Sequence, residues 1–330
     1  MSGNREDNGD LLLIEKLSFQ MGMVKSEIKK VIIGQDDIID KLLTALLSKG
    51  HCLLVGVPGL AKTLLIKTLA EVLDLKFSRI QFTPDLMPSD ITGTDILEED
   101  MQTRKRELRF IKGPVFANII LADEINRTPP KTQSALLEAM QEYKVTAAGI
   151  NYPLEEPFFV LATQNPIEQE GTYPLPEAQL DRFMFSLWLD YPDYKNEIEI
   201  IKSTTGNITP RLEKIITGRE IMQFQEVIRK VPVADNVVEH AVSIVNSTRP
   251  SAPASGKFIK EYVSWGAGPR AAQFLILAAK TNAVLKGRLT PSIGDVNEFL
   301  LPVLRHRIIP NFSAEADGIN ALEIIKNLSK

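Results

Sequence analysis

Eight consecutive residues near position 60 have the types expected of a loop that binds phosphate groups. They are Gly56, Val57, Pro58, Gly59, Leu60, Ala61, Lys62 and Thr63. In such a loop the backbone N–H groups converge on phosphate oxygens, a lysine reaches the β- and γ-phosphates, and a hydroxyl binds Mg²⁺. Lys62 and Thr63 supply these two side chains, and a helix that begins near Lys62 adds its positive N-terminal end. The alternative is a Gly/Pro turn that precedes Lys-Thr by chance; Ala61 also stands where a glycine is usual.

A pair of carboxylates, Asp123 and Glu124, follows the apolar segment 118–121. In a parallel sheet the carboxyl ends of the strands meet at the ligand crevice. There Asp123 can hold Mg²⁺, and Glu124 can accept a proton from an attacking water. The alternative is an acidic turn that ends a strand and has no chemical role.

A third polar position, Asn165, follows the apolar segment 158–162 and precedes Pro166. An amide at the end of a neighbouring strand can orient the water that attacks a phosphate. Asn-Pro is also a common turn signal, so this pattern alone leaves both interpretations open.

Composition excludes several classes of protein. The chain has 330 residues, 44% of them hydrophobic and 24% charged, which is typical of a globular protein rather than a disordered one. The lone cysteine, Cys52, excludes a disulfide framework and a cysteine-based zinc site. A formal charge of −4 disfavours nucleic acid as a partner. Without a signal peptide or a long apolar span, we expect a cytoplasmic protein with no membrane span.

The spacing of apolar residues predicts an α/β fold. Short apolar runs predict strands over 51–55, 76–82, 118–121, 158–162 and 184–189. Helical spacing appears over 11–31, 36–48 and 64–73, and Thr128 followed by Pro129 predicts a further helix start. Segments 94–116 and 145–152 are expected to form hairpins. This alternation indicates a parallel sheet covered on both faces.

The sequence changes character after Pro192. Helices are predicted over 220–230, 234–246, 270–286, 293–307 and 315–328, and no strand is expected there. We therefore place an N-terminal helix and an α/β nucleotide-binding core in residues 1–192, and an all-helical lid in residues 193–330.

Several motifs, and their order along the chain, resemble those of the MoxR family of AAA+ ATPases. This family belongs to the clade that contains the magnesium-chelatase ATPase subunits. Besides the loop and carboxylates, the resemblance rests on segments 31–35, 122–130, 162–166, 175–183 and 268–271. It spans about Val31 to Arg307 and implies an AAA+ P-loop NTPase core with a helical lid. Loops of this family often carry alanine where Ala61 stands.

The resemblance also implies roles for residues that spacing alone does not identify. Asn165 is similar to the sensor-1 residue, and Arg182 to the arginine finger presented to a neighbouring subunit's nucleotide. Arg270 is similar to sensor 2, which approaches the γ-phosphate of its own subunit. Ile33 and Gly34 resemble the segment that packs on adenine. Arg182 in a surface ion pair and Arg270 without a ligand contact remain the alternatives.

Relatives in this clade use two hairpins to contact a client, and the hairpins 94–114 and 144–152 lie at the corresponding positions. The tip Arg104-Lys105-Arg106 follows acidic residues, and a tip of mixed charge is most often a solvated turn. His51, His240 and His306 show no ligand spacing, and for His306 packing or a hydrogen bond is favoured over catalysis. A metal-adhesion Asp-x-Ser-x-Ser motif is absent, so the family's von Willebrand factor A-type partner would be a separate protein.

These observations predict a Mg²⁺-dependent ATPase that binds ATP and ADP and works as a ring, by resemblance a hexamer. Its output would be chaperone-like remodelling or maturation of a client protein complex, including insertion of a metal cofactor. Three alternatives stay open: a magnesium-chelatase-like motor subunit, a nucleotide-gated scaffold with little turnover, and a nucleic-acid motor, which the acidic composition disfavours.

Overall fold

The structure, a computed structural model, describes residues 3–99, 106–147, 149–167, 171–207 and 210–328. The chain divides into two compact units, and neither is continuous in sequence. The loop unit contains Leu53–Leu175 and Trp188–Gly218 and therefore carries the predicted phosphate loop. The helical unit contains Met1–Cys52, Pro176–Leu187 and Arg219–Lys330.

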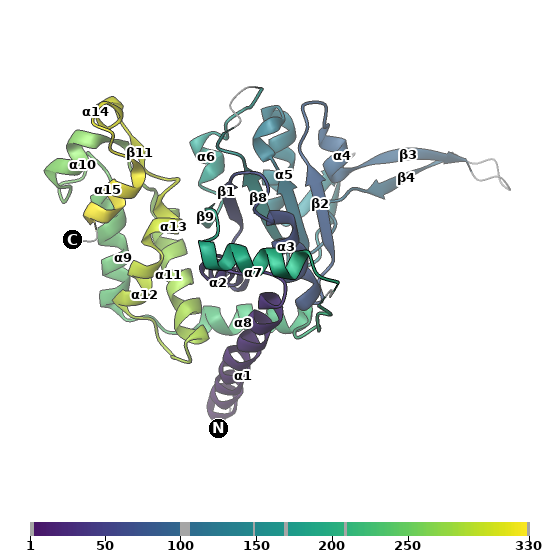
Figure 1. The fold of residues 1–330 in the computed structure, drawn as a ribbon, viewed down its shortest axis with the longest axis horizontal. Coiled ribbons are helices and arrows are strands. Elements are labelled where there is room, and N and C mark those ends of the chain that lie inside the picture. Colours follow the sequence, from purple (N-terminus) through teal and green to yellow (C-terminus); the bar gives the residue numbers. More distant parts are fainter. Residues whose placement is uncertain (1–2, 100–105, 148, 168–170, 208–209, 329–330) are drawn as a thin grey trace. The chain divides into compact units, whose positions relative to one another are not determined.

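A five-stranded sheet lies at the centre of the α/β fold (Figure 1). In spatial order its strands are β2 (Phe77–Gln81), β5 (Ile119–Asp123), β8 (Phe159–Gln164), β1 (Cys52–Gly56) and β9 (Phe185–Leu189). Strand β5 pairs in parallel with both β2 and β8. Every residue of β1 and β5 is buried, and since successive side chains point to opposite faces, both faces are covered. The predicted parallel sheet is confirmed.

The loop unit has four helical elements between strands of this sheet and one after its last strand. The first four are α3 (Lys62–Val72), α4 (Pro88–Thr92), the 3₁₀ turn η1 (Ile125–Arg127) and α5 (Pro130–Glu142), and α7 (Tyr194–Thr204) follows β9. Helix α5 starts later than predicted: Pro129 is its N-cap, while Thr128 is extended, as residues before proline tend to be. Helix α7 was not predicted, because none of its side chains is buried and its apolar residues mark no core face.

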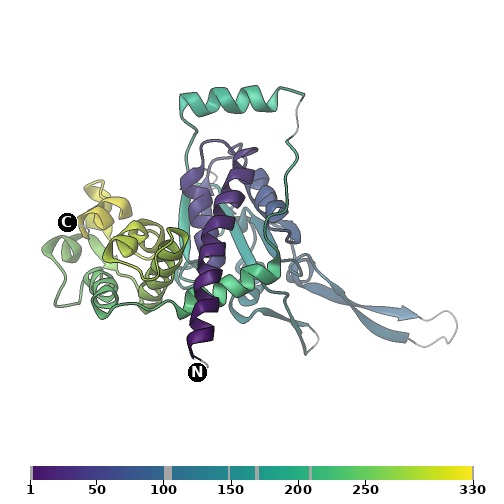
Figure 2. The same ribbon diagram turned by 90° about the horizontal axis from the view of Figure 1, so that it is seen from below.

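Two antiparallel hairpins confirm the predicted extended segments. Strand β3 (Gly93–Glu99) pairs with β4 (Arg106–Lys112), and β6 (Lys144–Ala147) pairs with β7 (Ile150–Pro153). The first hairpin extends away from the sheet as a long arm (Figures 1 and 2). At its base Gly93 has φ +102°, and a Cβ there would lie 2.2 Å from the Ile111 carbonyl oxygen, so only glycine fits. Arg104 and Lys105 of the predicted basic tip lie outside the described residues.

The helical unit is built around one central helix, α11 (Pro269–Leu285), which packs against α1, α2, α9, α12 and α13. The other helices are α1 (Gly3–Lys29), α2 (Asp36–Leu47), α6 (Glu177–Leu180), α8 (Gly218–Lys230), α9 (Asp235–Ser247), α10 (Lys257–Tyr262), α12 (Ile293–Glu298), α13 (Leu300–Leu304), α14 (Phe312–Ala316) and α15 (Ala321–Leu328). The C-terminal region is helical, as predicted.

Three details of that region differ from the prediction. The helix expected over 293–307 is divided at Phe299, which places Pro302 in the first turn of α13, where its missing N–H costs no hydrogen bond. The helix expected over 315–328 is interrupted by Gly318, whose φ is +70°. A short antiparallel ribbon joins β10 (Val263–Trp265) to β11 (Ile309–Pro310), although no strand was predicted.

The boundary near residue 192 stays a prediction about domain organisation. The compact units are divided differently, because 176–187 group with the C-terminal helices and α7 groups with the loop unit. Among the described residues, no helix is both long enough and apolar enough to cross a membrane.

A buried carboxylate in the helical unit, Asp295, which pairs with a part-exposed arginine, yields the first prediction. Burial alone would raise the pKa of Asp295, but hydrogen bonds from Arg288 and Ser292 outweigh it and hold that pKa well below its usual range. In the unfolded chain the pKa of an aspartate carboxyl is about 4. The lowered pKa in the folded state therefore stabilises the fold above this pH, and the stabilisation is lost as the pH falls further. We expect Asp295→Asn to cost about 1–3 kcal/mol at pH 7.

Thermal unfolding of wild type and Asp295→Asn at pH 7 and at acidic pH checks this expectation. The gap in melting temperature should narrow below pH ~4. A gap that is constant with pH would show that the charge of Asp295 is not what stabilises the folded state.

Candidate functional site

The phosphate loop leaves strand β1 at Gly56 and enters helix α3 at Lys62. A Cβ at Gly56 would lie 3.0 Å from both the Cβ and the carbonyl oxygen of Leu189, so the strand approaches its neighbour too closely for a larger residue. Gly59 has φ +86° and Ala61 has φ +55°. Both residues are in the left-handed region, which turns the loop back on itself immediately before the helix begins.

The Lys62 ammonium lies inside the loop that it is expected to serve. Its Nζ donates a hydrogen bond to the Gly56 carbonyl oxygen at 2.6 Å. Partial burial lowers the pKa of Lys62, while Asp123 and Glu124 act in the opposite direction. The site therefore places a cation, held by a replaceable carbonyl contact, beside two carboxylates.

The Asp123 carboxylate, at the end of β5, has a donor on each oxygen. Thr163 Oγ1 donates to Oδ1 at 2.7 Å, and Arg79 donates to Oδ2 through Nη2 at 2.6 Å and Nε at 3.2 Å. Arg79 was not among the predicted site residues. Arg79 lies on β2 opposite Leu121 of β5, two residues before Gln81, which lies opposite Asp123. Its contact with Asp123 could therefore be predicted only by knowing that β2 and β5 are neighbours.

The Glu124 backbone adopts a left-handed conformation, with φ +57°, which is unusual for a non-glycine residue. Its N–H donates to Thr163 Oγ1 at 2.9 Å, which helps to hold that conformation. Gln81 Nε2 and Arg127 Nη1 both donate to Oε2, at 3.1 and 3.0 Å. Within the described residues, neither donor reaches Oε1, so one carboxylate oxygen is left for a ligand or water.

Asn165 follows β8 and is buried. Its Oδ1 accepts a hydrogen bond from the Ile167 N–H at 3.2 Å, as in an Asx turn. The Asn-Pro turn that was the alternative interpretation is thus present, and the same bond orients the NH₂ group of Asn165.

These residues line one cavity of about 450 Å³, which joins the loop to the carboxylates and the amide. Its walls are Pro58, Gly59, Leu60, Ala61, Lys62, Thr63, Leu64, Asp123, Glu124 and Asn165. The structure thus brings together most of the predicted site residues within the loop unit.

Four predicted site residues belong to the helical unit. Ile33 and Gly34 immediately precede α2, and Gly34 has φ +75°. Arg182 follows α6. Arg270, the second residue of α11, donates from Nη1 to Asp181 Oδ2 at 3.2 Å.

A second arginine, Arg307, fixes the segment that carries Arg182. Its Nε donates to Asp181 Oδ1 at 2.7 Å, and its Nη2 donates to the carbonyl oxygens of Asp181 at 2.8 Å and Phe183 at 2.7 Å. Burial lowers the pKa of Arg307 to about 10, against the opposing effect of Asp181. His306 Nε2 also hydrogen-bonds the Phe183 carbonyl, at 3.0 Å, which agrees with the structural role predicted for it.

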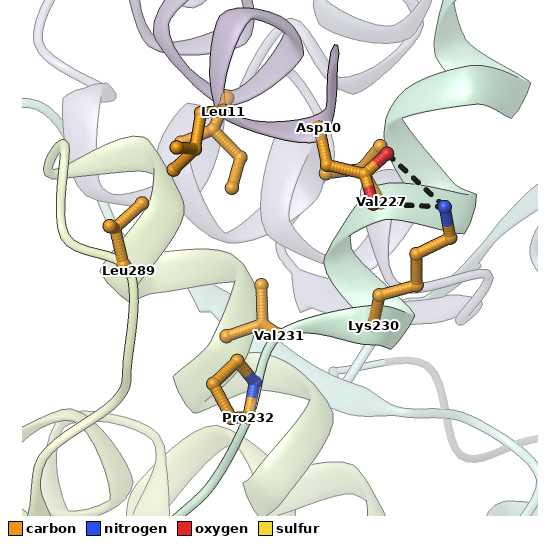
Figure 3. A pocket seen from close by; sticks show the side chains of 8 residues that line it. Asp10, Leu11, Val227, Lys230, Val231, Pro232 and Leu289 are labelled. Atoms are coloured by element: carbon orange, nitrogen blue, oxygen red, sulfur yellow. Dashed lines mark hydrogen bonds and ion pairs between the residues drawn. The ribbon is translucent and has the colours of Figure 1, made fainter. Parts of the chain in front are cut away.

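A larger cavity, of about 580 Å³, lies in the helical unit between α1 and α8 (Figure 3). Its lining is mainly apolar, and its charged groups, Asp10 and Lys230, are paired with each other at 2.9 Å. The phosphate loop and the Asp123–Glu124 pair do not line it. The smaller cavity at the phosphate loop is therefore the candidate active site.

Two family profiles match this chain. Residues 51–185 match the ATPase family associated with various cellular activities (AAA), and residues 257–328 match the AAA lid domain. The first match contains the whole phosphate loop and its cavity, and the second contains Arg270 and Arg307.

Similar proteins cover nearly the same length. The chain is 46% identical to the chaperone MoxR1 of Mycobacterium tuberculosis over 301 residues. This match covers 91% of this chain and 78% of MoxR1. It is 29% identical to protein MoxR of Methylorubrum extorquens, over 86% of this chain and 85% of that protein. A crystal structure from Cytophaga hutchinsonii, of a protein assigned as an ATPase, matches with a TM-score of 0.90 and 42% identity over 100% of this chain and 98% of that one.

The two left-handed residues of the loop give a pair of opposite predictions. A Cβ at Gly59 meets no atom within 4 Å, so Gly59→Ala costs only backbone strain, about 1–2 kcal/mol. We expect it to weaken nucleotide binding, whereas Ala61→Gly relieves strain and keeps binding.

Fluorescent-nucleotide titration of both variants measures the effect, with the melting temperature followed in parallel. Equal binding by Gly59→Ala and wild type would mean that the left-handed turn at Gly59 is not required for the loop to bind phosphate.

Proposed function

The chain belongs to the MoxR family of AAA+ ATPases, and we propose that it hydrolyses ATP in the loop cavity to remodel a client protein complex. One observation carries the assignment of the site. Lys62, Thr63, Asp123, Glu124 and Asn165 all line the same cavity of about 450 Å³, at the carboxyl ends of neighbouring strands.

The loop binds the triphosphate. Backbone N–H groups of residues 56–63 and the N-terminus of α3 surround the β- and γ-phosphates. Lys62 leaves the Gly56 carbonyl for a phosphate oxygen, which is a stronger acceptor for an ammonium group. The backbone around Ile33 and Gly34 contacts the adenine. ADP fits the same loop, since it keeps the β-phosphate and lacks only the γ-phosphate contacts.

The oxygen donors present suit Mg²⁺. This ion prefers hard oxygen ligands and keeps few protein contacts when it also binds phosphates. The Thr63 hydroxyl and the Asp123 carboxylate would hold it. When bound, it would neutralise charge that develops on the phosphate oxygens.

Glu124 is the general base. Gln81 and Arg127 hold its Oε2, which fixes the carboxylate plane and leaves Oε1 to accept a proton from water. Asn165 orients that water through its amide NH₂ group, while its Oδ1 is engaged by the Ile167 N–H.

Two arginines complete the site. Phosphoryl transfer is catalysed mainly by positioning and charge stabilisation, and a guanidinium suits both because it is planar and always charged. Arg182 acts on the nucleotide of the neighbouring subunit, and Arg270 approaches the γ-phosphate of its own.

Assembly and output follow from the family. AAA+ ATPases typically form oligomers, and an arginine that acts across an interface requires a neighbour; we propose a ring, specifically a hexamer. A relative named as a chaperone supports a protein client. We also propose a separate von Willebrand factor A-type protein as co-partner and the cytoplasm as location. Maturation of the client, including metal-cofactor insertion, is the proposed output.

Steady-state hydrolysis separates an enzyme from a nucleotide-gated scaffold. We expect Lys62→Ala to lower kcat/KM on the order of 10²–10³-fold, because it removes a preorganised cation. Glu124→Gln should lower kcat on the order of 10²–10⁴-fold while ATP still binds. Phosphate release and nucleotide titration give the two readouts. Turnover that neither substitution changes would contradict this mechanism, and stimulation by DNA or RNA would favour a nucleic-acid motor.

The proposed trans action of Arg182 has its own test. We expect Arg182→Ala and Glu124→Gln each to be inactive alone, with the loss from Arg182→Ala on the order of 10³–10⁵-fold. In mixed rings, some interfaces combine an intact Glu124 with an intact Arg182, so part of the activity should return. Rings shown by light scattering and subunit exchange to be mixed, yet still inactive, would argue that Arg182 does not act across the interface.

A further inference from the structure

One carboxylate in the helical unit is shared by two arginines. Asp181 is the C-cap of α6, and its Oδ1 accepts from Arg307 Nε at 2.7 Å while its Oδ2 accepts from Arg270 Nη1 at 3.2 Å. Asp181 also immediately precedes Arg182 in the chain. A single acidic group therefore contacts the proposed γ-phosphate sensor and is covalently adjacent to the proposed finger.

The two arginines are held very differently. The Arg307 side chain is 2% exposed, and besides the Asp181 carboxylate it donates to several backbone carbonyl oxygens. Arg270 is 40% exposed, and Asp181 is its counter-ion among the described residues, at the longer distance. Arg307 is thus a permanent part of the core, whereas the Arg270 pair is a solvent-accessible contact that another anion can replace.

We propose that Asp181 is a positioning residue that retains Arg270 as a counter-ion until the γ-phosphate of ATP takes its place. The inference rests on the proposed role of Arg270 and adds how that arginine is controlled. Asp181 competes with the nucleotide for one guanidinium, so it lowers the affinity for ATP and leaves the affinity for ADP unchanged.

The chemistry of the two acceptors explains why the exchange proceeds. A γ-phosphate presents several charged oxygens and forms bidentate contacts with arginine. The Asp181 carboxylate contacts Arg270 through a single oxygen, and its charge is already shared with Arg307. ADP has no γ-phosphate, so it offers Arg270 no alternative partner.

Binding of the two nucleotides tests the proposal directly. In a Glu124→Gln background, which prevents turnover, Asp181→Asn keeps an oxygen acceptor for Arg307 but removes the charge that retains Arg270. We expect the Kd for ATP with Mg²⁺ to fall by about fivefold, the size set by a part-exposed ion pair, and the Kd for ADP to stay within about twofold. A purely structural role would not change the ATP-to-ADP ratio.

A matched control exists in the same unit. Asp295 pairs with Arg288 as Asp181 pairs with Arg307, although the Asp295 side chain is 3% exposed and that of Asp181 is 30% exposed, and Asp295 makes no hydrogen bond to Arg270. Asp295→Asn should lower the melting temperature without changing the ratio. A second control, Asp181→Glu, retains the negative charge and should restore a ratio close to that of wild type.

The double variant Asp181→Asn/Arg270→Ala closes the cycle. If Asp181 acts through Arg270, Asp181→Asn has no effect on ATP affinity once Arg270 is absent. Should Asp181→Asn fail to fold, Asp181→Asn/Arg307→Gln leaves no buried charge unpaired, and the same ratio is measured in that background.

The outcomes separate this inference from the function on which it rests. Arg270→Ala alone should weaken ATP binding and spare ADP; if it does not, the proposed role of Arg270 is wrong. If Arg270→Ala behaves as expected but Asp181→Asn weakens ATP binding, changes both nucleotides equally or changes neither, then Asp181 does not retain Arg270 and only the present inference is overturned.

Discussion

The carboxylate of Asp123 organises the candidate site because both of its oxygens are engaged by neighbouring strands. Thr163 binds Oδ1 from β8 and Arg79 binds Oδ2 from β2, so three adjacent strands meet at one side chain. Thr163 also accepts the N–H of Glu124 and thereby supports its left-handed backbone. An unpaired carboxylate at this depth would be costly, and the hydrogen bonds that prevent this cost also aim the adjacent glutamate.

The helical unit depends on a comparable buried group, Arg307. A guanidinium out of contact with water must satisfy its donors, and here Asp181 and several backbone carbonyl oxygens do so. Apart from the Val303 carbonyl, those acceptors belong to residues 181–184, which helps to explain why this short segment groups with the C-terminal helices rather than with the strands that precede it in sequence. The Phe274 ring lies 5.2 Å from the Arg307 guanidinium and covers the same group.

Sequence reasoning identified those parts of the site that one strand and its following loop contain. Lys62, Thr63, Asp123, Glu124 and Asn165 each follow an apolar run, and strand ends converge in any parallel sheet, so their proximity was predictable. Arg79, Gln81 and Arg127 were not predicted, because their roles depend on which strand is the neighbour and on the direction of a 3₁₀ turn. The same limit applies to the fold. Most of the longer helices were predicted, but α7 was not, and the breaks at Phe299 and Gly318 depend on proline placement and backbone handedness.

The charges of the site explain how an acidic chain binds a polyanion. Net charge describes the whole surface, whereas a bound nucleotide experiences the few groups within reach of its phosphates. In the loop cavity Lys62 is held by a carbonyl, Asp123 is neutralised by Arg79, and Glu124 is engaged by Arg127. Each charge thus already has a partner before the phosphates arrive, so binding exchanges partners instead of creating unpaired charges. Lys62 has the easiest exchange, since a neutral carbonyl oxygen competes poorly with a phosphate oxygen for an ammonium group.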